Sequence, residues 1–387
     1  MIRVILIVIL SISVLSCNRF NPDDYKLIIQ NVQLFNGDSL YQSATILVQD
    51  SAIKKIILRP TSLSGSNVID GTGKTLLPGL INAHVHAQAV EHLKEAAETG
   101  VLTLLDLFTT DPKRADSLRN LGFHRADLAY YYSAGPTVTV PGAHGSQFGP
   151  VPLVDSVEEV PQFVEDRVNE GSDYIKLIIE SGPDSEWPTL TDEMIRLAIK
   201  QSHELNKLAV AHISKRKDAL KAVEYDIDGL VHIWSRDTTY ITQQQIDLLK
   251  NRNAFIVPTL LVTDSVKARW EESLDIDVLM HDVLAIHEAG IPILAGTDPP
   301  NFGLNYGTSL FDEMELLVNA GLSELEVLKS ATSNVAKSFQ LDHGYIKEGV
   351  SADMVLIDGN PIADIKHIRK VYKVFKFGDE IIPVNKP

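Results

Sequence analysis

Short apolar runs alternate with amphipathic stretches through the middle of the chain, from about residue 75 to residue 295. The runs have the length of buried strands, and the stretches at 156–169, 191–205 and 242–251 repeat apolar residues at helical spacing after polar starts. Such alternation predicts repeated strand–helix units. The eight apolar runs are Leu76–Ala83, Val101–Phe108, Leu128–Ser133, Tyr174–Ile179, Leu208–Ile213, Gly229–Trp234, Phe255–Leu261 and Ile291–Ala295.

Eight parallel strands with intervening helices predict an α/β fold, a (β/α)8 TIM-like barrel over residues 75–343. An open doubly wound sheet is the weaker alternative, because no glycine-rich phosphate loop follows an early strand. Residues 24–74 and 344–387 read as short strands and turns. We expect these two chain ends to pair into one small, discontinuous β-sandwich domain.

The first 17 residues have the order of an export signal. A basic start at Met1–Arg3 is followed by an apolar run at Val4–Val14, which is short for a membrane span, and then by Leu15, Ser16 and Cys17. This boundary resembles a bacterial lipoprotein lipobox, which implies lipidation of Cys17 and export to the periplasmic side. By the same resemblance, Asn18 implies an anchor in the outer membrane. An ordinary cleaved signal with a coincidental cysteine is the alternative.

Composition limits the partners and the metal chemistry of the chain. Its 387 residues are 44% hydrophobic, so a sizeable core can form, and its net charge of −16 without a basic run argues against nucleic acid. The single cysteine, Cys17, excludes an internal disulfide. Any metal in the mature protein must therefore be held by nitrogen and oxygen ligands. The sequence does not determine the oligomeric state, and a homo-oligomer is possible.

Polar residues capable of binding metal stand at the ends of the predicted strands, where barrels of this type carry their chemistry. Directly after the first run, His84 and His86 are two positions apart, so an extended backbone points both imidazoles to one side. Lys176 lies inside an apolar strand, where a solvated charge does not fit. The full set of predicted metal-site residues is His84, His86, Lys176, His212, His232 and Asp298.

The segment 77–86, Leu-Pro-Gly-Leu-Ile-Asn-Ala-His-Val-His, resembles the first-strand motif of the amidohydrolase superfamily. The resemblance continues through the other four residues in that family's order and through 344–356, its return to a β-sandwich. The nearest branch is the imidazolonepropionase-related and prolidase-like one, and Lys176 favours its two-metal members. Asn82 departs from the pattern, because the family usually has Asp there.

This resemblance implies two divalent metal ions, Zn²⁺ in our reading, and a carbamate formed on Lys176 from carbon dioxide. One ion would be held by His84, His86 and Asp298, the other by His212 and His232, and the carbamate would bind both. A carbamate turns a cation that is hard to bury into an anion with two oxygen ligands.

The predicted reaction is hydrolysis of a C–N bond in a small-molecule amide, peptide or cyclic amide by metal-activated hydroxide. Asp298 would take the proton and deliver it to the leaving amine. The alternatives are a one-metal deaminase or imidazolonepropionase-like hydrolase and, from another class, a non-catalytic ligand-binding lipoprotein.

Several other polar residues invite a role at the site. His144 lies in a loop similar to a Gly-Gly-His-Gly loop of related peptidases, and we expect it to face substrate, although chance exposure explains it equally well. Tyr306, in the last loop, is a second candidate for substrate binding. Asp106 could bind substrate or cap the segment that follows it, and we favour the cap. We interpret Glu313 as part of a solvated first helical turn.

Overall fold

The computed structural model describes residues 21–182, 186–270 and 274–382. The predicted signal segment with Cys17 therefore lies outside the described residues. Within the described ranges, no helix combines the length and apolar character needed to cross a membrane.

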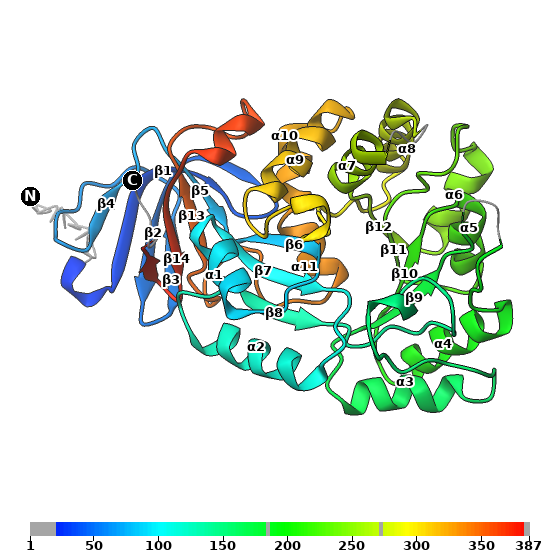
Figure 1. The fold of residues 1–387 in the computed structure, drawn as a ribbon. Coiled ribbons are helices and arrows are strands. Elements are labelled where there is room, and N and C mark those ends of the chain that lie inside the picture. The colour runs from blue at the N-terminus through cyan, green and yellow to red at the C-terminus, as the bar shows by residue number, and fades with distance from the viewer. Residues whose placement is uncertain (1–20, 183–185, 271–273, 383–387) are drawn as a thin grey trace, which may run out of the picture.

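The two chain ends meet in one eight-stranded sheet, in which β5 lies between the strands of the two ends. Its order is β15-β14-β13-β5-β1-β2-β3, with β4 paired to β1. Figure 1 shows this terminal sheet at one end of the molecule. A second sheet facing it, which a sandwich requires, is not assigned among the described strands. Its strands are β1 (Leu27–Phe35), β2 (Leu40–Gln49), β3 (Ala52–Ile57), β4 (Val68–Asp70), β5 (Thr75–Pro78), β13 (Met354–Ile357), β14 (Val371–Lys376) and β15 (Asp379–Ile381).

The remaining strands form two parallel sheets, one next to the terminal sheet and one farther from it (Figure 1). One has the order β6-β7-β8 and the other β12-β11-β10-β9. All seven coincide with predicted runs. Their bounds are β6 (Leu80–Val85), β7 (Val101–Asp106), β8 (Tyr130–Ser133), β9 (Ile175–Ile179), β10 (Ala209–Ile213), β11 (Gly229–Val231) and β12 (Phe255–Val257).

Short contacts connect the edges of these two parallel sheets. An isolated parallel bridge joins Val138 to Leu177 in β9, and another joins Ile256 in β12 to Ile293. On the other side, the amide of Ala83 in β6 donates to the carbonyl of Ala295 over 2.9 Å. The eighth predicted run thus lies between β12 and β6, although in the described chain it contributes a bridge and not a strand.

The first predicted run, Leu76–Ala83, is divided between two sheets. Its first part is β5 of the terminal sheet and its second part is β6. The change occurs at Gly79, where a Cβ atom would come within 2.7 Å of the Leu102 side chain. The amide of Gly79 donates to the Asp353 carbonyl, whereas that of Leu80 donates to Gly100 in front of β7. An uninterrupted apolar run cannot reveal this change of partner.

Helices follow most of the parallel strands, and two of the three predicted polar starts cap them. Thr191 accepts a hydrogen bond from the amide of Met194, and Thr242 forms a capping box with Gln245. The third predicted helix, at 156–169, begins only at Val160 and has no side-chain cap. The α-helices are α1 (Val90–Glu98), α2 (Pro112–His124), α3 (Val160–Asn169), α4 (Asp192–Glu204), α5 (Arg216–Glu224), α6 (Gln243–Asn251), α7 (Leu260–Trp270), α8 (Ile276–Glu288), α9 (Ser309–Asn319), α10 (Glu324–Ser330) and α11 (Ser333–Ser338). The 3-10 helices are η1 (Pro22–Asp24), η2 (Ser146–Phe148), η3 (Asn301–Gly303) and η4 (Ile365–Arg369).

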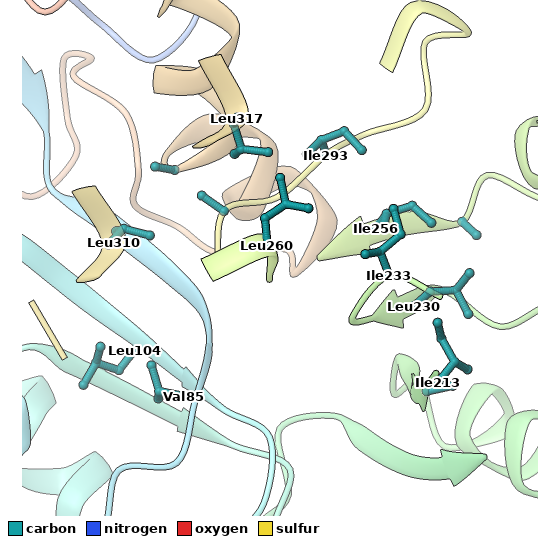
Figure 2. Close-up of a cluster of buried hydrophobic side chains, with 14 of the residues drawn as sticks. Val85, Leu104, Ile213, Leu230, Ile233, Ile256, Leu260, Ile293, Leu310 and Leu317 are labelled. Atoms are coloured by element: carbon teal, nitrogen blue, oxygen red, sulfur yellow. The ribbon is translucent and has the colours of Figure 1, made fainter. Parts of the chain in front are cut away.

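Aliphatic side chains from both parallel sheets and from the helices share one buried core. Figure 2 shows Val85 and Leu104 of β6 and β7, Ile213 and Leu230 of β10 and β11, and Leu310 of α9 within this cluster. All five are fully buried. This packing fixes the strands, and therefore the polar residues at their carboxyl ends.

Candidate metal centre

All six predicted metal-site residues line one cavity of about 750 Å³. They reach it from the ends of β6, β10 and β11, from within β9, and from the segment after Ala295. Residues up to 214 positions apart in the sequence are thereby brought together, since both His84 and Asp298 line the cavity. The cavity is the expected place for the chemistry of parallel strands with intervening helices.

His84, His86 and Asp298 form one side of the centre. The Asp298 Oδ1 atom lies 2.9 Å from His86 Nε2 and 3.4 Å from His84 Nε2. Gly296 permits this approach, because a Cβ atom there would lie 2.9 Å from the His84 backbone nitrogen. Asp298 itself has φ of 63°, a backbone conformation that is strained for a side chain of this kind.

Asn82, the departure from the family pattern, connects the segment that carries His84 to the segment that carries Asp298 through hydrogen bonds. Its Oδ1 atom accepts from the amides of His84 and Thr297, both over 3.2 Å. Its Nδ2 atom donates to the Thr297 hydroxyl over 2.7 Å. The substitution of Asp by Asn therefore keeps hydrogen bonds that fix the ligand-bearing segments, as second-shell groups do around metals.

His212 and His232 form the other side of the centre. Their ring centroids are 4.6 Å apart, and the His232 ring is 4.9 Å from that of His84. The Nδ1 atom of His232 lies 2.8 Å from the Thr259 hydroxyl, which leaves Nε2 for the cavity. One ligand atom each from His84, His232 and Asp298 can be found within 4.8 Å of one another.

Lys176 occupies the middle of β9 with its amine in an unusual environment. The side chain is buried, and Nζ has no hydrogen-bond partner among the described residues. Burial lowers the pKa of the Lys176 amine to about 7. A buried amine without an acceptor is rare in folded proteins, because buried polar groups are almost always hydrogen-bonded.

The protonation states of three of the four histidines favour metal binding. Burial lowers the pKa values of His84 and His232 well below the ordinary value, and it also lowers that of His212. Neutral imidazoles with a free ring nitrogen are metal ligands. Four imidazoles, one carboxylate and one unpaired amine fit divalent metal ions of the zinc type.

His144 lies where a substrate-facing residue was expected. It lines the cavity, and its ring stacks on His212 with centroids 4.8 Å apart. Gly145 makes this possible, because a Cβ atom there would lie 2.4 Å from the Ile178 side chain of β9. The loop therefore rests on the strand that carries Lys176.

Tyr306 does not reach the cavity, contrary to our expectation. It is buried, its hydroxyl donates to the His86 carbonyl over 2.8 Å, and its ring stacks on His92. The hydroxyl of Tyr306 therefore donates its hydrogen bond to the backbone of His86, a predicted ligand. Its position makes it a support of His86, and no substrate contact follows from it.

Two acidic residues were interpreted wrongly from the sequence. Asp106 is fully buried and accepts from the Ser133 hydroxyl over 2.8 Å, and burial raises its pKa to about 7. Glu313 is also fully buried, where a solvated helical turn was expected. Its two oxygens accept from the amides of Leu260 and Leu261, which begin α7. Acidic residues in a first helical turn look alike whether they face water or another helix.

Sequence reasoning missed Glu180, Ser214 and Arg236, which also line the cavity. Glu180 directly follows β9, is buried, and places Oε2 3.7 Å from His212 Nε2. The signal was present in the sequence, since each of the three lies within four residues of a predicted ligand or of the end of a predicted strand. Thr259, the partner of His232, carries the same signal, because it lies two residues before the end of the predicted run Phe255–Leu261.

The sequence is similar to those of several enzymes of known activity. Ochratoxinase from Aspergillus niger is 26% identical over 264 residues, which cover 61% of this chain and 52% of the relative, so the chain spans about half of that protein's length. A 5-methylthioadenosine/S-adenosylhomocysteine deaminase from Thermococcus sibiricus is 24% identical over 418 residues, covering 90% of this chain and 88% of the relative.

Among solved structures, a Xaa-Pro dipeptidase with methionine bound in the active site has a TM-score of 0.79 at 22% identity. The matched region covers 92% of this chain and 99% of the dipeptidase chain. Such a likeness shows the fold. The pattern of the amidohydrolase family matches residues 75–381, which is most of the sequence. The chain therefore belongs to the amidohydrolase family.

Proposed function

We propose that this protein is a metal-dependent hydrolase that cleaves the C–N bond of small amides, peptides or cyclic amides. The observation that carries the proposal is the convergence of His84, His86, Lys176, His212, His232 and Asp298 on one cavity. A protein that merely binds a ligand has no need of this donor set. The non-catalytic alternative is therefore the weaker one.

The centre would hold two divalent ions, Zn²⁺ in our proposal. His84, His86 and Asp298 would hold the first ion, and His212 and His232 would hold the second. When bound, such ions supply Lewis-acid polarisation of the carbonyl and lower the pKa of water. The neutral imidazoles add no charge of their own, so the anionic ligands set the net charge of the centre.

Lys176 would complete the centre as a carbamate. Its Nζ is buried without a partner, and its lowered pKa of about 7 leaves much of the amine neutral at physiological pH. The neutral nitrogen attacks carbon dioxide, a proton is released, and the amine becomes an anion with two oxygens. This change removes the unfavourable burial of an ammonium group.

Asp298 would move the proton during hydrolysis. Its carboxylate lies against His86 and His84, at the cavity wall. It accepts the proton of the attacking water and delivers it to the leaving amine. His144, also on the wall, is placed to contact the substrate carbonyl.

Metal content tests the proposal most directly. We would measure zinc per chain in protein supplied with zinc and bicarbonate, with Lys176→Ala and the exposed-lysine variant Lys373→Ala as its control. About two ions in the wild-type protein and the control, falling sharply in Lys176→Ala, support the proposal, together with hydrolysis of a panel of dipeptides and N-acyl amino acids. No metal in folded protein would remove the enzyme proposal.

A one-metal deaminase is the second candidate, because the deaminase from Thermococcus sibiricus aligns over 90% of this chain. It predicts one ion that is indifferent to Lys176→Ala, and release of ammonia from 5-methylthioadenosine. Two ions and no release of ammonia would exclude it.

We also propose the finer architecture and the location. The bridges at Val138 and Ile293 and the Ala83–Ala295 bond support closure of the parallel strands into a (β/α)8 barrel, with the terminal sheet as part of a β-sandwich. The order of residues 1–17 supports export and a lipid anchor on Cys17 at the outer membrane. Labelling with radioactive palmitate tests the anchor, and the label should be lost in Cys17→Ser.

A further inference from the structure

Aromatic side chains line the mouth of the cavity that holds the predicted metal ligands. Phe148, in η2, is 57% exposed and Trp187 is 47% exposed, although large apolar side chains usually avoid water. Both line the cavity, as does Phe108, two residues after the end of β7. We call these three residues the aromatic rim.

The aromatic rim is continuous with the metal centre. The Phe108 ring centroid lies 6.2 Å from that of His86 and 5.9 Å from that of Phe148. The Phe148 ring in turn lies 5.8 Å from His144, which stacks on His212. A group bound against the rim is therefore next to the reacting centre.

The backbone holds the rim in place. The Trp187 amide donates to the Ser181 carbonyl over 3.2 Å, and its ring lies against Gly182, where a Cβ atom would come within 2.6 Å of the indole. Phe148 follows Gly145, which packs on Ile178 of β9. These glycines let two exposed aromatic residues sit close to β9.

Polar lining residues also come from elements that do not carry the aromatic rim. Ser214 follows β10, whereas Ser235 and Arg236 follow β11. On the side of α7, the lining includes the apolar Val262 and Val266 together with Thr263. A substrate that uses this cavity must therefore present a polar part and a bulky apolar part.

We infer that the aromatic rim binds a bulky apolar or aromatic substituent adjacent to the scissile amide, which makes lipophilic N-acyl amino acids or peptides with large apolar side chains the substrate class. The inference rests on the proposed function and deepens it. Covering the rim removes apolar surface from water on both partners, which corresponds to about fourfold in affinity for each methylene group buried.

Two matched series of compounds test this. The first is a set of N-acylglycines with acyl groups from acetyl to octanoyl and naphthoyl, and the second is a set of N-acetyl amino acids with lengthening side chains. For each, kcat/KM is measured on the metal-loaded protein. The affinities of the corresponding free acids and amino acids are measured by calorimetry, which does not depend on turnover.

In at least one series, kcat/KM and affinity should rise with apolar size, and Phe148→Ala should reduce the gain of its largest member about tenfold or more. Tyr372→Ala, which truncates a 42% exposed aromatic residue on β14, is the matched control and should preserve the gain. Flat series, or a gain unchanged in Phe148→Ala, would overturn the inference. A rim-dependent gain in affinity without any cleavage would keep the inference and reject the proposed function.

Discussion

Asp298 is the residue on which the proposed proton transfer depends most directly. Asp298→Asn keeps an oxygen near His84 and His86, where Oδ1 now lies 3.4 Å and 2.9 Å from their Nε2 atoms. The amide cannot accept a proton, however. We expect kcat to fall by about 10² or more, with much of the metal retained. Kinetics and metal content measured on the same sample check this, and full turnover in the variant would reject the assigned role.

Thr259 lies behind a predicted ligand, His232, and does not itself line the cavity. Its hydroxyl, 2.8 Å from His232 Nδ1, fixes the ring so that Nε2 faces the cavity. Thr259→Val removes this bond at nearly constant volume, so metal affinity should fall about 10–100-fold. Competition with a chelator measures the affinity. Thr259→Ser retains the hydroxyl and should bind metal like the wild-type protein; equal weakening in both variants would point to packing instead.

Glu313 shows how one buried carboxylate organises a helix start. It lies on α9 and accepts from the amides of Leu260 and Leu261, the first residues of α7. The helix α7 supplies Val262 and Val266 to the cavity, and Thr259 lies directly before it. Glu313 therefore connects α9 to the wall of the site.

This carboxyl group should make stability depend on pH. Burial raises the pKa of Glu313 to about 8 from an ordinary value of 4.5, so between these values the folded protein keeps a proton that the unfolded chain releases. Its contribution is complete below pH 4.5 and is lost as the pH rises towards 8. Glu313→Gln should remove this part of the slope. Thermal melts from pH 5 to pH 8 check it, and parallel curves for the two proteins would contradict it.

Sequence patterns predicted the elements better than their partners. The runs at 174–179 and 208–213 became β9 and β10 almost unchanged, because burial on both faces gives a continuous apolar run. The run at 76–83 was divided at Gly79, since the reason for the break, the Leu102 side chain, comes from elsewhere in the chain.

In the same way, the predicted ligands were easier to identify from the sequence than the residues that support them. His84, His212 and Asp298 could be predicted because strand ends are visible in the sequence. Tyr306 and Glu313 could not, because their partners, the His86 carbonyl and the Leu260 amide, are distant in sequence. Tertiary hydrogen bonds of this kind leave no local pattern.

A buried lysine fastens the terminal sheet to the parallel strands. Lys376 of β14 is fully buried, and its Nζ donates to the carbonyls of Gly122, Arg125 and Leu128 around the end of α2. The ammonium also lies 3.8 Å from the centre of the Tyr130 ring in β8. A cation at the carboxyl end of a helix is favoured by the helix dipole.

Replacing this lysine should therefore loosen the molecule as a whole. Lys376→Met fills similar space but leaves three backbone carbonyls around α2 without their donor, and each unsatisfied buried group costs about 1–3 kcal/mol. We expect the free energy of unfolding to fall by about 3 kcal/mol or more. Lys373→Met is the matched control on the same strand, because Lys373 pairs with Glu380 at the surface, where such pairs contribute about 0–1 kcal/mol. Urea denaturation of both variants measures the difference. If the two variants lost equal and small amounts, Lys376 would be a passive filler; a large loss confined to Lys376→Met would establish it as the fastening between the chain ends and the catalytic strands.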